Sequence, residues 1–203
     1  MLKIALFGTS ADPPTAGHQK ILQWLGEHYD HVAVWAADNP FKEHQTTLEH
    51  RLRMLQLLIQ EIPSPEHNIE LREDLSDRRS LISVQKAQEV WGNQAQYTLV
   101  IGSDLAAQIR GWYRIEELLQ AAQIRGWYRI EELLQKVSLV IVPRTGYPIK
   151  KEDIQALEKL GGKCRIADII VPDISSSAFR ISRDKNVVTP PIQNYIKQEK
   201  LYA

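Results

Sequence analysis

Near the N-terminus, a run of small and polar residues ends in a glycine and a histidine. The segment Gly8–His18 has the sequence GTSADPPTAGH, follows the apolar run Leu2–Phe7 and precedes a helical pattern that begins at Gly17. This order predicts a strand, a turn, and a helix whose first turn contains Gly17 and His18. The first turn of a helix has unpaired N–H groups and a partial positive charge, which attract phosphate. We therefore expect Gly17 to let a phosphate approach the backbone, and His18 to donate a hydrogen bond to it.

A second candidate for phosphate binding lies near the C-terminus, where three serines precede an arginine. The segment Ile174–Arg180 has the sequence ISSSAFR. Serine hydroxyls cap helices and donate to phosphate oxygens, and a guanidinium can bind two oxygens at once. Each segment alone also has an ordinary explanation, a glycine-rich turn for the first and a serine-capped surface helix for the second. The first matches neither the P-loop nor the dinucleotide-binding glycine pattern.

Together the two segments resemble the T/H-x-G-H and I-S-S-T-x-I-R signatures of the nucleotidylyltransferase superfamily. Further stretches are similar to one branch, the bacterial nicotinate-nucleotide adenylyltransferases: IGSDL at 101–105, a following WYR, VPRTGY at 142–147 and the tail Pro191–Tyr202. The resemblance covers nearly the whole chain. It departs from the family where GGTFDP is replaced by GTSADP, where the first motif histidine is Thr15, and where S-Y-T-V-D has only a weak counterpart in Ser80–Val84.

The resemblance implies an adenylyltransferase of NAD biosynthesis. The 5′-phosphate of nicotinate mononucleotide would attack the α-phosphorus of ATP, and pyrophosphate would leave. Catalysis of this kind depends on positioning and charge neutralisation and needs no protein nucleophile. Mg²⁺ would bridge phosphate oxygens and keep most of its water, so no protein metal ligands are expected. The alternatives are pantetheine-phosphate adenylyltransferase, which shares both phosphate signatures, and a nucleotide-binding protein impaired by the duplication described below.

The resemblance also implies roles for individual residues. The expected catalytic residues are His18, Arg180 and Lys42. The expected ATP-binding residues come from three parts of the chain: Gly8, Thr9, Ser10, Thr15, Gly17, His18, Gly102, Asp104, Ile174, Ser176, Ser177 and Arg180. The expected substrate-binding residues are Lys42, Ser83, Arg144 and the tryptophan of a repeated GWYR segment, which is Trp112 or Trp127.

Several of these residues have simpler explanations that the sequence leaves open. Lys42 lies in a loop, where most lysines are solvated, and Asp104 is placed to cap a helix. Arg144 is nearly as well explained as a surface arginine. Two other arginines, Arg51 and Arg53, are expected on an exposed helix face.

These side chains need a framework that brings the two segments together. Apolar runs predict six strands, at Lys3–Phe7, Val32–Ala36, Ile69–Arg72, Tyr97–Ile101, Ser138–Val142 and Arg165–Val171. Helical patterns fall between most of them, at Gly17–His28, Leu48–Ile62, Leu81–Trp91 and Lys150–Leu160. The alternation predicts an α/β, Rossmann-like, doubly wound parallel sheet of five to six strands, with helices on both faces and a C-terminal helical segment. Ligands of such sheets bind at the carboxyl edge where the strand order reverses, so Gly8–His18 and Gly102–Asp104 are expected to share one site.

The composition suits a single domain over residues 1–203, with 25 basic and 25 acidic residues. No bulk charge recruits nucleic acid or a membrane surface, and no stretch reaches the ~20 apolar residues that span a bilayer. Cys164 is the only cysteine, which excludes an internal disulfide and suggests a reducing compartment. Since a signal-peptide pattern is also missing, we expect a cytoplasmic enzyme whose partners are ATP and a pyridine mononucleotide.

Residues 106–120 and 121–135 are identical copies of AAQIRGWYRIEELLQ. Family members resembled by this chain carry the segment once, so we interpret one copy as an insertion, natural or engineered. Looping out about fifteen residues costs on the order of a few kcal/mol of closure entropy. The sheet should therefore survive, with local heterogeneity or a domain-swapped dimer or other homo-oligomer arising at the repeat.

Overall fold

The computed structural model describes residues 1–37, 46–63, 68–106, 108 and 129–202. Six parallel strands form one sheet in the order β3-β2-β1-β4-β5-β6. The strands are β1 Lys3–Thr9, β2 His31–Ala36, β3 Ile69–Leu71, β4 Gln96–Gly102, β5 Ser138–Val142 and β6 Cys164–Ile166. The order reverses between β1 and β4, which confirms the predicted doubly wound α/β sheet and identifies these two strands as its switch point.

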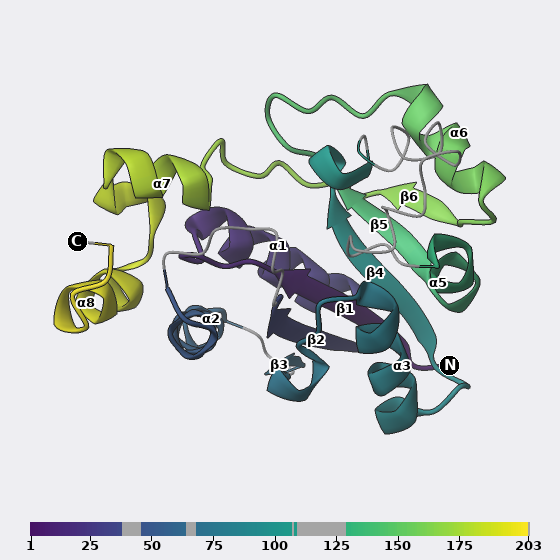
Figure 1. Ribbon diagram of the computed structural model, residues 1–203, viewed down its shortest axis with the longest axis horizontal. Coiled ribbons are helices and arrows are strands. Elements are labelled where there is room, and N and C mark those ends of the chain that lie inside the picture. Colours follow the sequence, from purple (N-terminus) through teal and green to yellow (C-terminus); the bar gives the residue numbers. More distant parts are fainter. Residues whose placement is uncertain (38–45, 64–67, 107, 109–128, 203) are drawn as a thin grey trace.

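Helices cover both faces of this sheet (Figure 1). The helices whose bounds the structure describes are α1 Ala16–His28, α2 Leu48–Gln60, α3 Ser80–Trp91, α5 Ile130–Lys136, α6 Lys151–Lys159, α7 Ser176–Ser182 and α8 Pro190–Gln198, with single 3₁₀ turns at Glu73–Leu75 and Lys185–Val187. Along β1, Ala5 and Phe7 join a core with α1, α2, α7 and α8, whereas Ile4 and Leu6 join a second core with α3, α5 and α6. The alternation follows from the two-residue period of a strand buried on both faces.

The last strand is shorter than the sequence predicts. The apolar run Arg165–Val171 predicts a strand of that length, but β6 ends at Ile166. β6 is an edge strand paired only with β5, and the Ala167 N–H donates the last bond to the Ile141 carbonyl at 2.9 Å. Beyond this point the apolar side chains Ile169 and Val171 pack against the core that contains α1 and α7. The prediction for this strand was wrong because apolar character there serves packing rather than strand pairing.

The described ends of the tandem repeat join the second core. Ala106, at the start of the first copy, is 1% exposed, and Leu133 and Leu134 of the second copy, 0% and 3% exposed, lie in the same cluster. The end of the second copy forms α5, which leads directly into β5. Residues 109–128, which include Trp112 and Trp127, lie outside the described residues. The heterogeneity expected at the repeat stays a prediction.

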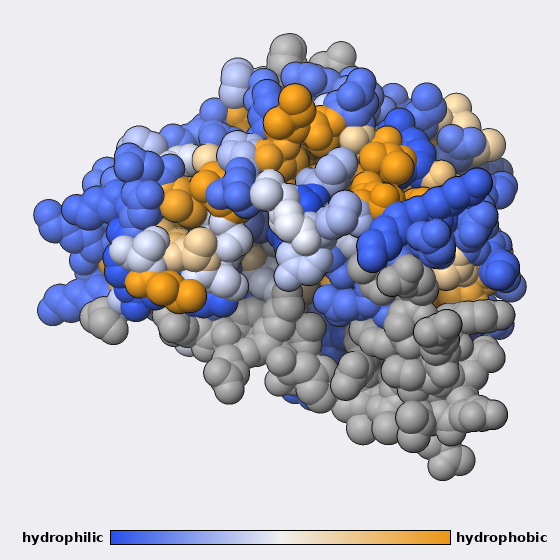
Figure 2. Space-filling model, turned by 90° about the horizontal axis from the view of Figure 1, so that it is seen from above, coloured by the Kyte–Doolittle hydropathy of each residue, from blue (hydrophilic) through white to orange (hydrophobic). Residues whose placement is uncertain are grey.

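The described surface is mixed in character. On the face seen from above in Figure 2, hydrophobic residues form separate patches among hydrophilic ones.

The longest helices that the structure describes have 13 residues, fewer than the ~20 apolar residues needed for a membrane crossing, and none of them qualifies as a span.

Candidate functional site

The loop between β1 and α1, residues 10–15, is packed into the protein rather than exposed. Ala11 and Asp12 are fully buried, Thr15 is 1% exposed, and the Asp12–Pro13 peptide bond is cis. Thr15 is the N-cap of α1, so Gly17 and His18 occupy the first turn of the helix. The carboxyl end of β1 therefore delivers these residues to the switch point of the sheet.

Hydrogen bonds on both ring nitrogens fix the orientation of His18. Its Nδ1 accepts from the backbone N–H of Thr15 at 3.1 Å and lies 2.9 Å from the Thr15 hydroxyl. Since a backbone N–H can only donate, Nδ1 is the acceptor, and in the neutral ring Nε2 carries the hydrogen. Nε2 lies 3.0 Å from Thr9 Oγ1 at the end of β1. His18 thus presents one N–H donor in a fixed direction.

The serine–arginine segment is attached directly to this loop. Ser175 Oγ caps α7 by accepting from the Ala178 N–H at 3.0 Å, and Ser176 Oγ donates to the Pro13 carbonyl at 2.8 Å. Arg180 donates from Nη1 to the Asp12 carbonyl at 2.6 Å and from Nη2 to Ser177 Oγ at 3.1 Å. Figure 1 shows α7 beside α1, at the end of the sheet toward which β1 points. The two segments are therefore in contact, as a shared phosphate site requires.

Polar residues also gather at the carboxyl end of β4, next to β1. Arg144 Nη1 lies 3.1 Å from Asp104 Oδ2, and the Arg144 N–H donates to the buried Ser103 Oγ at 3.0 Å. A Cβ at Gly102 would displace the carboxylate of Asp104 from its present position. Arg144 is thus paired with Asp104 rather than simply solvated. The pair adds one charge of each sign to the switch point.

The other residues that the sequence predicts for the site are found in several parts of the protein. Ser10 contributes its carbonyl to a hydrogen bond with Arg51, and Ile174 packs beside Gly17. Ser83 lies in α3 with 1% exposure, and its Oγ has no hydrogen-bond partner among the described residues. Three predicted residues, Lys42, Trp112 and Trp127, fall outside the described residues.

Arg51 is buried, contrary to the prediction of an exposed position. It is 2% exposed, and its Nη1 donates to the carbonyls of Ser10 at 3.0 Å and Ala37 at 2.8 Å. Ser10 follows β1 and Ala37 follows β2, so one guanidinium holds the ends of both strands. Arg53 is exposed, as predicted. The spacing of Arg51 to the buried Met54, Leu55 and Leu58 places it on the apolar face of α2, a signal that the sequence contained.

The sequence assigns no site role to two residues, Thr46 and Tyr202, that contact Asp12. Asp12 Oδ1 accepts from the hydroxyl of Tyr202 at 2.6 Å and from that of Thr46 at 2.7 Å. Tyr202 comes from the end of the chain after α8, 190 positions away. Local patterns cannot predict a contact at this separation.

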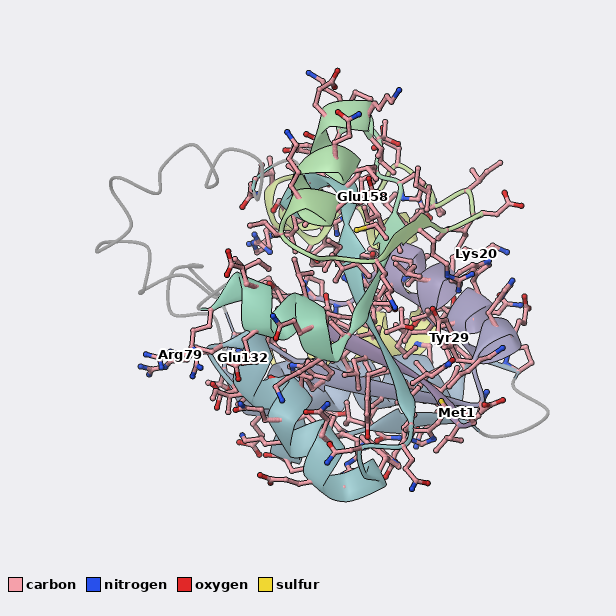
Figure 3. The ribbon with its side chains drawn as sticks, turned by 90° about the vertical axis from the view of Figure 1, so that its right-hand side faces the viewer. Met1, Lys20, Tyr29, Arg79, Glu132 and Glu158 are labelled. Carbon is pink, nitrogen blue, oxygen red and sulfur yellow. The ribbon has the colours of Figure 1, made fainter. Side chains whose placement is uncertain are left out.

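The only cysteine is not suited to nucleophilic chemistry. Cys164 lies at the start of β6, and burial together with the carboxylate of Glu158, labelled in Figure 3, raises the pKa of its thiol to about 11. The thiol is therefore protonated at neutral pH, which argues against Cys164 as a nucleophile.

We expect Gly8→Ala to destabilise the fold. A Cβ at Gly8 would lie 2.7 Å from ring atoms of Trp35, which is 2% exposed and is its partner in the β1–β2 register. Overpacking of this kind costs about 1–3 kcal/mol of unfolding free energy, measurable by denaturant titration. Gly17→Ala is the matched control, because a Cβ there meets its nearest atoms at 3.4 Å and should be tolerated. Equal stability of the two variants would contradict this account of Gly8.

Comparisons with known proteins show what this chain resembles. A family profile described as cytidylyltransferase-like matches residues 6–181. A probable nicotinate-nucleotide adenylyltransferase of Synechocystis sp. is 46% identical over 213 aligned residues, covering 99% of this chain and 99% of that protein. A probable nicotinate-nucleotide adenylyltransferase of Bacillus cereus is 29% identical, covering 100% of this chain and 99% of its own. The solved Plasmodium falciparum nicotinic acid mononucleotide adenylyltransferase complexed with NaAD superimposes with a TM-score of 0.78 at 20% identity, covering 100% of this chain and 98% of that one.

Proposed function

The chain belongs to the nicotinate-nucleotide adenylyltransferase family, and we propose that it binds the triphosphate of ATP where the β1–α1 loop meets α7. Enzymes of this family transfer the adenylyl group of ATP to the 5′-phosphate of nicotinate mononucleotide, giving the deamido-NAD dinucleotide and pyrophosphate. The observation that carries the proposal is the hydrogen bond from Arg180 to the Asp12 carbonyl, which joins the two anion-binding segments.

In the reaction, an oxygen of the mononucleotide phosphate forms a bond to the α-phosphorus of ATP. The bond from this phosphorus to the bridging oxygen breaks, and pyrophosphate leaves with the electron pair. Negative charge grows on the oxygens around the α-phosphorus and on the leaving group. A donor held in advance toward these oxygens stabilises the transition state without reorganisation.

His18 supplies such a donor. Its Nε2–H, which lies against the Thr9 hydroxyl in the structure, can bind an α- or β-phosphate oxygen instead. Thr15 holds the opposite ring nitrogen, so the donor keeps its direction during this exchange. Gly17 lies in the same helical turn, where N–H groups face the ligand.

Arg180 is the proposed ligand of the departing phosphates. Its bonds to Asp12 and Ser177 use two of the five N–H donors of a guanidinium. The planar fork is thereby oriented, and its remaining donors suit the β- and γ-phosphates. The exposed Ser177 is a proposed helper, whereas Ser176 donates to the Pro13 carbonyl and holds the loop.

The Asp104–Arg144 pair is the proposed boundary between the two substrates. Asp104 suits the ribose hydroxyls of adenosine, and Arg144 suits the negative charge of the mononucleotide. Lys42, Ser83 and one of the two repeat tryptophans stay predictions as further substrate ligands.

The donor set of the site fits a metal ion that enters with the nucleotide, and we propose Mg²⁺. Among the described residues, no three His, Cys, Asp or Glu side chains form a metal cluster. Asp12 accepts from two hydroxyls, and Asp104 is paired with Arg144. Hydroxyls, an imidazole and a guanidinium bind phosphate oxygens, so the ion would keep phosphate and water ligands. When bound, the ion would neutralise phosphate charge.

A pyrophosphate-release assay tests the proposal. The protein is incubated with ATP and, separately, nicotinate mononucleotide, nicotinamide mononucleotide or pantetheine phosphate. We expect release with nicotinate mononucleotide. ATP binding without release for any acceptor would indicate a protein impaired by the duplication, and release with pantetheine phosphate alone would support the alternative enzyme.

The matched control for the duplication is a chain that lacks residues 121–135 and so carries the segment once. Restored activity in this variant would locate the defect in the repeat. Size-exclusion chromatography of both chains tests the proposed homo-oligomer or domain-swapped dimer.

A further inference from the structure

The end of the chain meets both proposed phosphate-binding segments at a single residue. Tyr202 is 8% exposed, and its hydroxyl donates to Asp12 Oδ1 at 2.6 Å. Its ring packs edge-on against Phe179 of α7, with centroids 5.6 Å apart, and lies under the guanidinium of Arg183 at 5.7 Å. Figure 1 shows the C-terminal end of the chain next to α7 and α8. Tyr202 thus touches the loop that precedes His18 and the helix that carries Arg180.

Asp12 connects Tyr202 to Arg180. The residue is fully buried, and its carboxylate accepts from Tyr202 and from Thr46. Its own carbonyl accepts from Arg180 Nη1 at 2.6 Å. The carboxylate and the carbonyl belong to the same residue, so hydroxyls that anchor the carboxylate also restrain the carbonyl that accepts from the guanidinium. Tyr202 has a path to Arg180 through one residue, without touching a substrate.

The backbone on either side of Leu201 adopts an energetically unfavourable conformation while these contacts are made. Lys200 and Tyr202 have φ angles of 53° and 59°, a left-handed conformation that non-glycine residues rarely adopt. The Leu201 N–H donates to the Ile196 carbonyl at 3.0 Å, which turns the chain back after α8. Burial and the nearby Asp12 carboxylate raise the pKa of the Tyr202 phenol well above its ordinary value. The hydroxyl therefore keeps its proton at neutral pH and can donate it to Asp12.

We propose that Tyr202 is a positioning residue of the adenylyl-transfer reaction: its hydroxyl fixes Asp12, and Asp12 orients Arg180. The proposal rests on the function assigned above, in which Arg180 binds the departing phosphates. In this proposal Tyr202 does not touch a substrate and acts on Arg180 through Asp12.

The test is Tyr202→Phe, which keeps the ring and removes the hydroxyl. Tyr195→Phe is the matched control, because Tyr195 also lies in the C-terminal segment and its hydroxyl is bonded to His50 Nδ1 at 2.8 Å, away from Asp12. We expect Tyr202→Phe to lower kcat about tenfold, since small misplacements of catalytic groups have effects of this size or larger. KM for nicotinate mononucleotide should not change, and Tyr195→Phe should keep the kcat of the unmodified chain. Thermal unfolding of both variants reports any loss of stability that they share.

Arg180→Lys, alone and combined with Tyr202→Phe, identifies the path. If Tyr202 acts through Arg180, its loss should matter little once the guanidinium is gone, with a further decrease under about twofold. The proposal would be overturned if Tyr202→Phe caused the same tenfold loss of kcat in the unmodified chain and in Arg180→Lys. It would also be overturned if Tyr202→Phe and Tyr195→Phe had equal kcat. Full activity of Arg180→Lys would instead overturn the function assigned to Arg180. If Tyr202→Phe does not fold, Thr46→Val removes the other hydroxyl on Oδ1 and should lower kcat only when Arg180 is present; unchanged kcat would then refute the inference.

Discussion

Replacing His18 with alanine should lower turnover by roughly 10²–10⁴-fold while ATP still binds, as for other lost transition-state donors. The structure explains why the effect should be on turnover. The Thr15 N–H occupies Nδ1, so Nε2 provides the donor, and alanine has none. Most ATP contacts would remain, because Arg180 makes its bonds to the Asp12 carbonyl and Ser177 without the imidazole. Initial rates of pyrophosphate release, set against ATP binding by calorimetry, measure both quantities.

The control for this experiment is His28→Ala at the other end of α1. His28 Nδ1 lies 2.7 Å from the Trp24 carbonyl, and the ring stacks on Trp24 at 4.1 Å, away from the β1–α1 loop. This variant should turn over normally. Unchanged turnover in His18→Ala, measured per folded molecule, would remove His18 from the mechanism.

The second large effect is expected from Arg180→Lys. Lysine keeps the positive charge but has no planar fork, so it cannot span the Asp12 carbonyl, the Ser177 hydroxyl and phosphate oxygens together. We expect kcat/KM for ATP to fall by about 10–100-fold, the range for one lost charge-assisted hydrogen bond. Arg53→Lys, on the exposed face of α2, should have no effect. Equal activity of the two variants would mean that Arg180 makes no bidentate contact.

The architecture was largely predictable because the sheet is buried on both faces. Apolar runs such as Ser138–Val142 are then continuous, and the β1–β4 switch point follows from the alternation with helices. The edge strand was less predictable, because the apolar residues after Ile166 contact a helix-covered core instead of a neighbouring strand.

The chemistry-bearing residues were predictable only where a motif carried them. His18 and Arg180 belong to such motifs, and the structure brings their segments into contact. Asp12 is bonded to Thr46 over a separation of 34 positions and to Tyr202 over 190 positions. Local spacing contains no information about contacts at such separations. The prediction of an exposed Arg51 is wrong because its helical spacing places it with Met54, Leu55 and Leu58 on the buried face of α2, where its charged group finds carbonyl partners.

The burial of Arg51 affects the entropy cost that we expect for nucleotide binding. Its guanidinium holds the carbonyls of Ser10 and Ala37 through hydrogen bonds that belong to the fold itself. The entropy of ordering the first loop is therefore lost when the chain folds, not when the nucleotide arrives. We therefore expect nucleotide binding to lose little interaction energy to the ordering of this loop.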